Sequence, residues 1–295
     1  MSANETYRTP DERFAGLPGW PYEPKYHEYD GVRLHYVDEG AGQPVLLVHG
    51  EPTWGYLWRK VMPPLLEAGY RVIVPDHAGF GRSDKPTDWQ WYSWDWHCAA
   101  LHALIEKLDL QDATTVVHDW GGPIGLRVST EAPERFPRIV MMDTGMWTGS
   151  QKMSDAWNTF RDFVERTDDL PIGFLIKGAC KLEVADDVFA AYEAPFPTPE
   201  SKAGARAFPL MIPLTPDVPD AKKGKAALDF LAEDGRPKLM LWADSDPVLP
   251  VSQGEAVAAR INAPAPEIIS DAGHFLQEDQ GEVIGRRIVS WLASL

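Results

Sequence analysis

The stretch VVHDWGGPIGL, residues 116–126, joins a predicted buried strand directly to a predicted helix. It opens with a pair of β-branched apolar residues, which are typical of strands. Gly121 and Gly122 stand where strand and helix meet, and residues without a Cβ let backbones approach closely there. Pro123 is tolerated in the first turn of a helix, where its missing N–H would be unpaired anyway. The stretch therefore predicts a tight strand-to-helix turn with an acidic residue, Asp119, in it.

Similar apolar runs recur along the chain, and each ends in a turn signal. Runs that are continuous rather than alternating are typical of strands buried on both faces of a parallel sheet. Helical periodicities lie between them, as in the C-terminal segment. The succession strand, helix, strand predicts a doubly wound α/β fold. The other runs are PVLLVHG (44–50), YRVIVPD (70–76), RIVMMD (138–143), PKLMLWAD (237–244) and PEIISDAG (266–273). 

In one region the alternation of strands and helices stops, and this region is expected to form a separate unit. Between Gly145 and Arg236 there is no comparable strand, only helical patterns and a proline-rich passage. An insertion between two parallel strands at their carboxyl ends would lie over the usual ligand site of such a sheet. We therefore expect a main domain of residues 1–144 and 237–295, with a helical cap formed by residues 145–236.

Composition narrows the classes of partner. The 295 residues carry 28 Lys and Arg against 44 Asp and Glu, a formal net charge of −16. Such a charge repels nucleic acid and anionic membrane surfaces, so neither is expected as a partner. The N-terminus has no apolar secretory segment, and no apolar run is long enough to span a bilayer. A cytoplasmic protein is expected, and the spacing of the two cysteines predicts no metal site.

Asp119 occupies the place that serine holds in the G-x-S-x-G nucleophile elbow, although Val117 replaces the first glycine of that motif. By itself Asp119 could equally be a simple helix cap. The sequence then presents Asp246, just after the strand that follows the insertion, and His274, after the last predicted strand. The order nucleophile, acid, histidine is that of α/β-hydrolases. Asp244 competes for the acid role, but Asp246 is favoured because it begins the loop that must reach the histidine.

A carboxylate nucleophile indicates a particular chemistry. It is already ionised at neutral pH and can displace a leaving group from saturated carbon, forming an alkyl ester. His274 is then free to activate the water that hydrolyses this ester, with Asp246 orienting the imidazole. Ester hydrolysis passes through an oxyanion that needs two N–H donors. The backbone N–H groups of Trp120 and Glu51 are the predicted pair, and the alternative for Glu51 is a solvated loop carboxylate without a role.

Five segments together resemble the haloalkane dehalogenases, in particular the subfamily with an Asp-His-Asp triad. They are LLVHGEPTWGYLWRKVMPPL, DHAGFGRSDKP, VVHDWGGPIGL, APFPTPESKAGARAFP and DAGHFLQED. The resemblance extends from about Tyr26 to the C-terminus. It implies an α/β-hydrolase fold with a helical cap and the hydrolysis of a carbon–halogen bond to a primary alcohol, halide and a proton. It implies no cofactor, a small neutral halogenated alkane and water as substrates, and a monomer or small homo-oligomer.

The resemblance also implies a halide site made of two tryptophans, of which Trp120 is one. An indole N–H suits this role because it donates a hydrogen bond and has no acceptor to repel an anion. The second tryptophan should come from the cap, but Phe160 stands where we align it. Trp157, three residues earlier on the same predicted helical face, is the favoured donor. Phe160 with only a ring-edge contact is the alternative, and Trp147 is a more distant candidate.

The same elbow is compatible with other activities. An epoxide hydrolase would need two tyrosines in the cap, and residues 145–236 contain only one tyrosine, Tyr192. A fluoroacetate-type dehalogenase would need a basic residue beside the nucleophile, where Trp120 stands. A catalytically inactive ligand-binding protein would be expected to lack part of the triad. A dry substrate pocket is predicted near the elbow, with candidate lining residues Phe160, Phe163, Phe174, Leu249 and Phe275.

Overall fold

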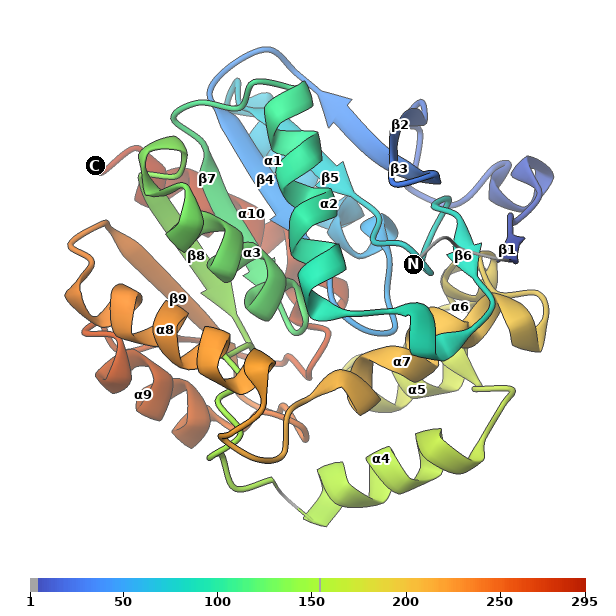
Figure 1. The fold of residues 1–295 in the computed structure, drawn as a ribbon. Coiled ribbons are helices and arrows are strands. Elements are labelled where there is room, and N and C mark those ends of the chain that lie inside the picture. Colours follow the sequence, from blue (N-terminus) through green and yellow to red (C-terminus); the bar gives the residue numbers. More distant parts are fainter. Residues whose placement is uncertain (1–4, 154) are drawn as a thin grey trace.

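The computed structural model describes residues 5–153 and 155–295, and its centre is an eight-stranded sheet (Figure 1). The strand order is β10-β9-β8-β7-β4-β5-β3-β2. A separate two-stranded sheet pairs β1 (Thr6–Tyr7) with β6 (Lys85–Pro86). The eight central strands are β2 (Lys25–Tyr29), β3 (Val32–Glu39), β4 (Pro44–Val48), β5 (Arg71–Pro75), β7 (Thr114–His118), β8 (Arg138–Met142), β9 (Lys238–Ala243) and β10 (Glu267–Ile269).

The pairing follows the predicted pattern. The six strands from β10 to β5 run parallel, with Val117 of β7 opposite Val48 on one side and Met141 on the other. These central residues are fully buried, as continuous apolar runs require. β2 and β3 form an antiparallel hairpin whose turn residues Asp30 and Gly31 both have positive φ. The predicted α/β fold is confirmed.

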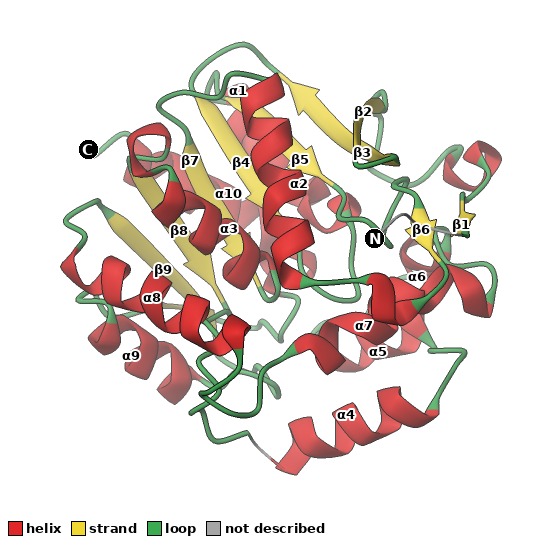
Figure 2. Cartoon of the chain, in the orientation of Figure 1, coloured by secondary structure: helices red, strands yellow, loops and turns green. Residues whose placement is uncertain are grey.

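Helices cover both faces of the sheet (Figures 1 and 2). α2, α3 and α8 lie on the face turned towards the viewer, and α1 and α10 lie behind it. No helix in the described ranges is long and apolar enough to cross a membrane. The helices outside the predicted cap are α1 (Met62–Glu67), α2 (Trp94–Lys107), α3 (Gly121–Glu131), α9 (Val251–Arg260) and α10 (Leu276–Leu292).

In the described residues of the segment between β8 and β9, all regular structure is helical. Four of its helices gather beyond the carboxyl ends of the strands, in the lower right of Figure 1, while α8 packs along α3 of the main layer. The segment contains α4 (Asp155–Arg166), α5 (Ile172–Ala179), α6 (Asp186–Glu193), α7 (Ala203–Met211) and α8 (Pro219–Glu233).

The turn between β7 and α3 is held by close backbone contacts. Asp119 has a φ of +47°, a left-handed conformation that side chains other than glycine seldom adopt. A Cβ at Gly121 would lie 2.1 Å from the carbonyl oxygen of Val48, and one at Gly122 would lie 1.8 Å from Thr144 Oγ1. Both glycines are therefore required, as the sequence indicated, because no side chain fits between the helix and its neighbours.

A buried ionic network ties α6 of the inserted segment to α10 of the main layer. Arg59 donates two hydrogen bonds to Glu278, of 2.6 and 2.7 Å, and the Tyr192 hydroxyl donates a third of 2.7 Å. Lys60 Nζ adds a fourth at 2.8 Å. Burial alone would raise the pKa of Glu278, but the hydrogen bonds and charge of Arg59 and Lys60 lower it to about 2. The carboxylate is therefore charged and fully paired.

We expect Glu278→Gln to lower the free energy of unfolding by about 3 kcal/mol, because it leaves the Arg59 charge buried without its partner. Glu282→Gln, in an exposed pair on the same helix, should change it by less than about 0.5 kcal/mol. Since the native pKa of Glu278 lies below the unfolded value of about 4.3, its contribution is present above that pH and is lost as pH falls towards 2. Denaturant melts of both variants between pH 3 and 7 measure the difference. Equal effects of the two substitutions would contradict the assignment.

Candidate active site

Asp119 presents its carboxylate at the carboxyl edge of the sheet. Its Oδ1 accepts a hydrogen bond of 2.7 Å from the backbone N–H of Glu51, and the backbone N–H of Trp120 also binds the carboxylate. Burial would raise the pKa of Asp119, but His274 foremost, together with His118 and the N–H of Trp120, outweighs it and lowers the pKa below its usual value. The group is therefore an anion at neutral pH.

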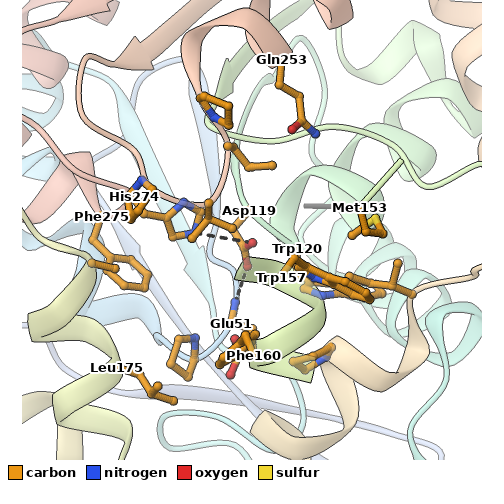
Figure 3. A pocket seen from close by; sticks show the side chains of 18 of the residues that line it. Glu51, Asp119, Trp120, Met153, Trp157, Phe160, Leu175, Gln253, His274 and Phe275 are labelled. Atoms are coloured by element: carbon orange, nitrogen blue, oxygen red, sulfur yellow. Dashed lines mark hydrogen bonds and ion pairs between the residues drawn. The ribbon is translucent and has the colours of Figure 1, made fainter. Parts of the chain in front are cut away.

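His274 lies between two carboxylates. Its Nε2 is 3.6 Å from Oδ2 of Asp119, and its Nδ1 is 2.8 Å from Oδ2 of Asp246. Burial would lower the pKa of His274, but the two negative charges, that of Asp246 foremost, hold it well above its usual value. The three predicted residues thus form one row, Asp119–His274–Asp246, of which Figure 3 shows Asp119 and His274.

Asp246 and Asp244 have different surroundings. Asp246 Oδ1 accepts hydrogen bonds from the backbone N–H groups of Val248 and Leu249, which leaves Oδ2 for the histidine. Asp244 accepts instead from the backbone of residues 271 and 272, in the loop before His274. Asp246 is therefore the carboxylate at hydrogen-bond distance from the imidazole, while Asp244 holds the loop that carries it.

The Glu51 side chain differs from the alternative of a solvated loop carboxylate. Only 7% of the residue is exposed, and its Oε1 has no hydrogen-bond partner among the described residues. Burial raises the pKa of Glu51 well above its usual value, and the nearby Asp119 carboxylate raises it further. Both effects favour the protonated form of the Glu51 side chain. The alternative of a solvated loop carboxylate is therefore excluded for Glu51, because segments remote in sequence bury the side chain.

A cavity of about 670 Å³ opens onto these groups. Its lining is mainly apolar and includes Phe160, Phe174, Leu249 and Phe275, all of them predicted. Phe163 was wrongly included, because its side chain is 40% exposed and lies outside the lining. It shares α4 with Phe160, so the helix turns one ring inwards and the other towards solvent.

The tryptophans named for the halide all line this cavity. Trp120 follows Asp119 at the start of α3, and Trp157 lies in the first turns of α4; each is less than 10% exposed. In Figure 3 both lie on the opposite side of Asp119 from His274. Phe160 lines the cavity too, one helical turn after Trp157. Trp147 also contributes, from the loop between β8 and α4.

Two groups beside the row were not predicted. Asp143, directly after β8, is fully buried; burial and the charge of Asp246 raise its pKa well above its usual value. His118, whose pKa is lowered to about 3 by burial, has its Nε2 2.8 Å from the carbonyl oxygen of His274. Since both residues end or follow predicted strands, their position at the carboxyl edge was the signal that could have found them.

The remaining candidates are not part of this arrangement. Tyr192, the tyrosine considered for an epoxide hydrolase, donates its hydroxyl to Glu278 and does not line the cavity. Across residues 5–153 and 155–295, no group of His, Cys, Asp or Glu side chains could hold a metal ion. What the site does offer is an anionic oxygen, a histidine oriented by a second carboxylate, and backbone donors at the Asp119 carboxylate. This set is suited to displacement at carbon followed by ester hydrolysis.

Comparison with known proteins agrees with this chemistry. Residues 43–181 match the alpha/beta hydrolase fold family. A haloalkane dehalogenase from Psychrobacter cryohalolentis is 40% identical over 97% of both chains, and one from Mycobacterium marinum is 39% identical over 97% of this chain and 99% of its own. The tetrameric haloalkane dehalogenase DpaA from Paraglaciecola agarilytica superposes with a TM-score of 0.90 at 36% identity, over 99% of both chains. The chain therefore belongs to the haloalkane dehalogenase family of α/β-hydrolases.

Proposed function

We propose that the protein hydrolyses small neutral haloalkanes through an alkyl ester on Asp119. The observation that carries the proposal is the row Asp119–His274–Asp246 at the floor of a mainly apolar cavity. An apolar cavity admits a neutral alkane and strips water from the nucleophile, which strengthens the electrostatic interactions inside. The expected products are a primary alcohol, a halide ion and a proton.

In the first step Oδ2 of Asp119 attacks the carbon that bears the halogen. Oδ1 is occupied by the N–H of Glu51, while Oδ2 faces the side of His274. A new bond forms between carbon and Oδ2 as the carbon–halogen bond breaks, and its electron pair leaves with the halide. The indole N–H groups of Trp120 and Trp157 are the proposed donors to that halide, with Phe160 contributing only a ring edge.

In the second step His274 Nε2 takes a proton from a water molecule as its oxygen attacks the ester carbon. The carbonyl oxygen is Oδ1, which already accepts a hydrogen bond from the N–H of Glu51, and the N–H of Trp120 is the proposed second donor. The negative charge therefore develops beside these donors. Asp246 stabilises the imidazolium. Collapse of the intermediate breaks the bond from carbonyl carbon to Oδ2, which leaves with the alkyl group. The imidazolium of His274 gives its proton to this oxygen to form the alcohol. The new carboxyl group, which has gained the oxygen of the water, loses its proton to solvent and restores the Asp119 carboxylate.

The similar proteins support two further parts of the proposal, the substrate class and the oligomeric state. The relatives' names denote action on haloalkanes, and this supports a halogenated alkane as substrate. DpaA is tetrameric, which supports a small homo-oligomer for this chain. The predicted cap, residues 145–236, is proposed to close the cavity through α4 and α5, which contribute Trp157, Phe160 and Phe174 to its lining.

The direct test is halide release from 1-bromobutane and 1,2-dibromoethane, with styrene oxide as the control for epoxide hydrolysis. Asp119→Asn should lower turnover by roughly 10⁴-fold or more, because it removes the nucleophile. His274→Phe should release one equivalent of bromide and retain the alkyl group, which mass spectrometry detects on Asp119. Wild-type rates in Asp119→Asn, or diol formation without halide release, would contradict the mechanism.

Exchange of the cap aromatics tests the halide site. Trp157→Phe should weaken bromide binding and lower kcat/KM by about tenfold or more, because it removes one hydrogen bond to an anion. Phe163→Leu, on the exposed side of the same helix, is the matched control and should change little. If Trp157→Phe has no effect while Phe160→Trp raises activity, the second donor is missing from this protein and the assignment of Trp157 fails.

Because the pKa of Asp119 is lowered and that of His274 is raised, the two steps should respond differently to pH. Asp119, with a lowered pKa, stays anionic as pH falls through the mildly acidic range, so the initial burst of halide should keep its rate. His274, with a pKa raised well above its usual value, must lose its proton before it can act as a base, so steady-state turnover should already fall as pH drops through neutrality, above the mildly acidic range. Quench-flow measurement of bromide separates the two phases. A parallel decline of both would show that one group limits both steps.

A further inference from the structure

The Asp279 carboxylate, in the first turn of α10, binds the main chain of two separate segments. Its Oδ2 accepts a hydrogen bond of 2.8 Å from the N–H of Gly273, the residue before His274. Oδ2 also accepts one of 2.8 Å from the N–H of Lys181, and Oδ1 accepts one of 2.8 Å from the N–H of Leu182. Since Lys181 and Leu182 follow α5, one side chain joins the inserted segment to the loop that carries the proposed base.

The same two segments also touch each other directly. The N–H of His274 donates a hydrogen bond of 2.8 Å to the carbonyl oxygen of Ala179, the last residue of α5. A Cβ at Gly273 would lie 2.3 Å from that oxygen, so the two main chains are in close contact and only glycine fits between them. The carbonyl oxygen of His274 lies 2.8 Å from Nε2 of His118. The main chain of His274 is therefore held at its N–H and at its carbonyl group.

Two carboxylates divide the support of the loop before His274. Asp244 accepts hydrogen bonds from the N–H groups of residues 271 and 272, at 2.9 and 3.3 Å. The N–H of Gly273 is bound by Asp279 instead, so Asp279 supports the residue that adjoins the base. Asp279 also fixes the chain that leaves α5, and α5 forms part of the cavity wall through residues such as Leu175 (Figure 3). One carboxylate thus fixes the cavity wall relative to the base.

We propose that Asp279 is a positioning residue for hydrolysis of the alkyl ester. It keeps the loop of His274 and the end of α5 in one arrangement, so that Nε2 stays within reach of the attacking water. The inference rests on the proposed dehalogenase function and concerns its second step. Asp279 is not among the residues that line the cavity, so it acts through His274 and not on the reacting atoms.

Alkylation in the first step does not depend on this support. The Asp119 carboxylate is held by the N–H of Glu51 and by the turn between β7 and α3, and Asp279 binds neither of them. A change at position 279 should therefore separate the two steps. A displaced catalytic group slows only the step in which it acts, and a misplacement of about 1 Å can cost roughly a hundredfold in rate.

The test is Asp279→Asn, which keeps the size of the side chain but turns one acceptor oxygen into an NH₂ group that repels a main-chain N–H. With enzyme in excess over 1-bromobutane, bromide release reports alkylation and 1-butanol formation reports hydrolysis of the ester. We expect butanol formation to slow by about tenfold or more, while bromide release keeps its rate. The alkyl ester on Asp119 should then accumulate, which mass spectrometry detects.

Asp271→Asn is the matched control, in the same loop. Asp271 is exposed and contributes to the network only through its main-chain N–H. Its φ of +56° is one that asparagine adopts readily, so the main chain should stay as it is. Both rates should remain at the wild-type value in this variant.

The outcomes separate this inference from the function on which it rests. Unchanged butanol formation in Asp279→Asn would overturn the positioning role, and so would an equal loss of both rates, which a purely structural role would give. Asp279→Glu keeps the charge and moves the acceptors by one methylene group; it should show the same separation of rates, and it decides the matter if Asp279→Asn does not fold. If the wild-type protein releases no bromide, the proposed dehalogenase function itself fails.

Discussion

The arrangement of the site depends on the tight turn between β7 and α3. A left-handed residue at position 119, with glycines behind it, is what lets the strand end and the helix start within so few residues. The turn pushes the carboxylate out over the edge of the sheet, where Glu51 N–H meets one oxygen. The neighbouring parallel strands then end at this same edge, and their loops bring His274 and Asp246 to the nucleophile.

Charge is distributed unevenly among the acids around this edge. Asp119 is held as an anion by His274 and by backbone donors, whereas burial and neighbouring anions raise the pKa of Glu51 and Asp143. Ionising all of these carboxyl groups together would place several like charges in a space with little water. The histidine charge is thus shared by the two acids that touch it, and alkylation of Asp119 would remove one of the two negative charges that raise its pKa.

The fold, and the three residues of the row, could be predicted because both depend on short patterns of neighbouring residues in the sequence. Apolar runs that end in turn signals identified the parallel strands, and Asp119, Asp246 and His274 follow strands in chain order. Burial of individual side chains could not be predicted in this way. Glu51 is buried by segments remote in sequence, and the phase of α4 separates Phe160 from the exposed Phe163. The same limit applies to Asp143, whose strand was predicted but whose role beside Asp246 depends on the packed loops.

The network around Glu278 also bears on how this protein could be recombined with its relatives. Tyr192 belongs to α6, yet its hydroxyl binds an acid four residues after His274. A chimera that imports α6 must therefore import a tyrosine with it, or Glu278 loses a bond close to the proposed base. The end of α5 is a second junction, because the Ala179 carbonyl accepts a hydrogen bond of 2.8 Å from the N–H of His274. An exchange confined to α4 avoids both junctions while still replacing Trp157 and Phe160. Of the inserted segment, α4 is therefore the helix that can be exchanged without breaking either of these bonds next to the proposed base.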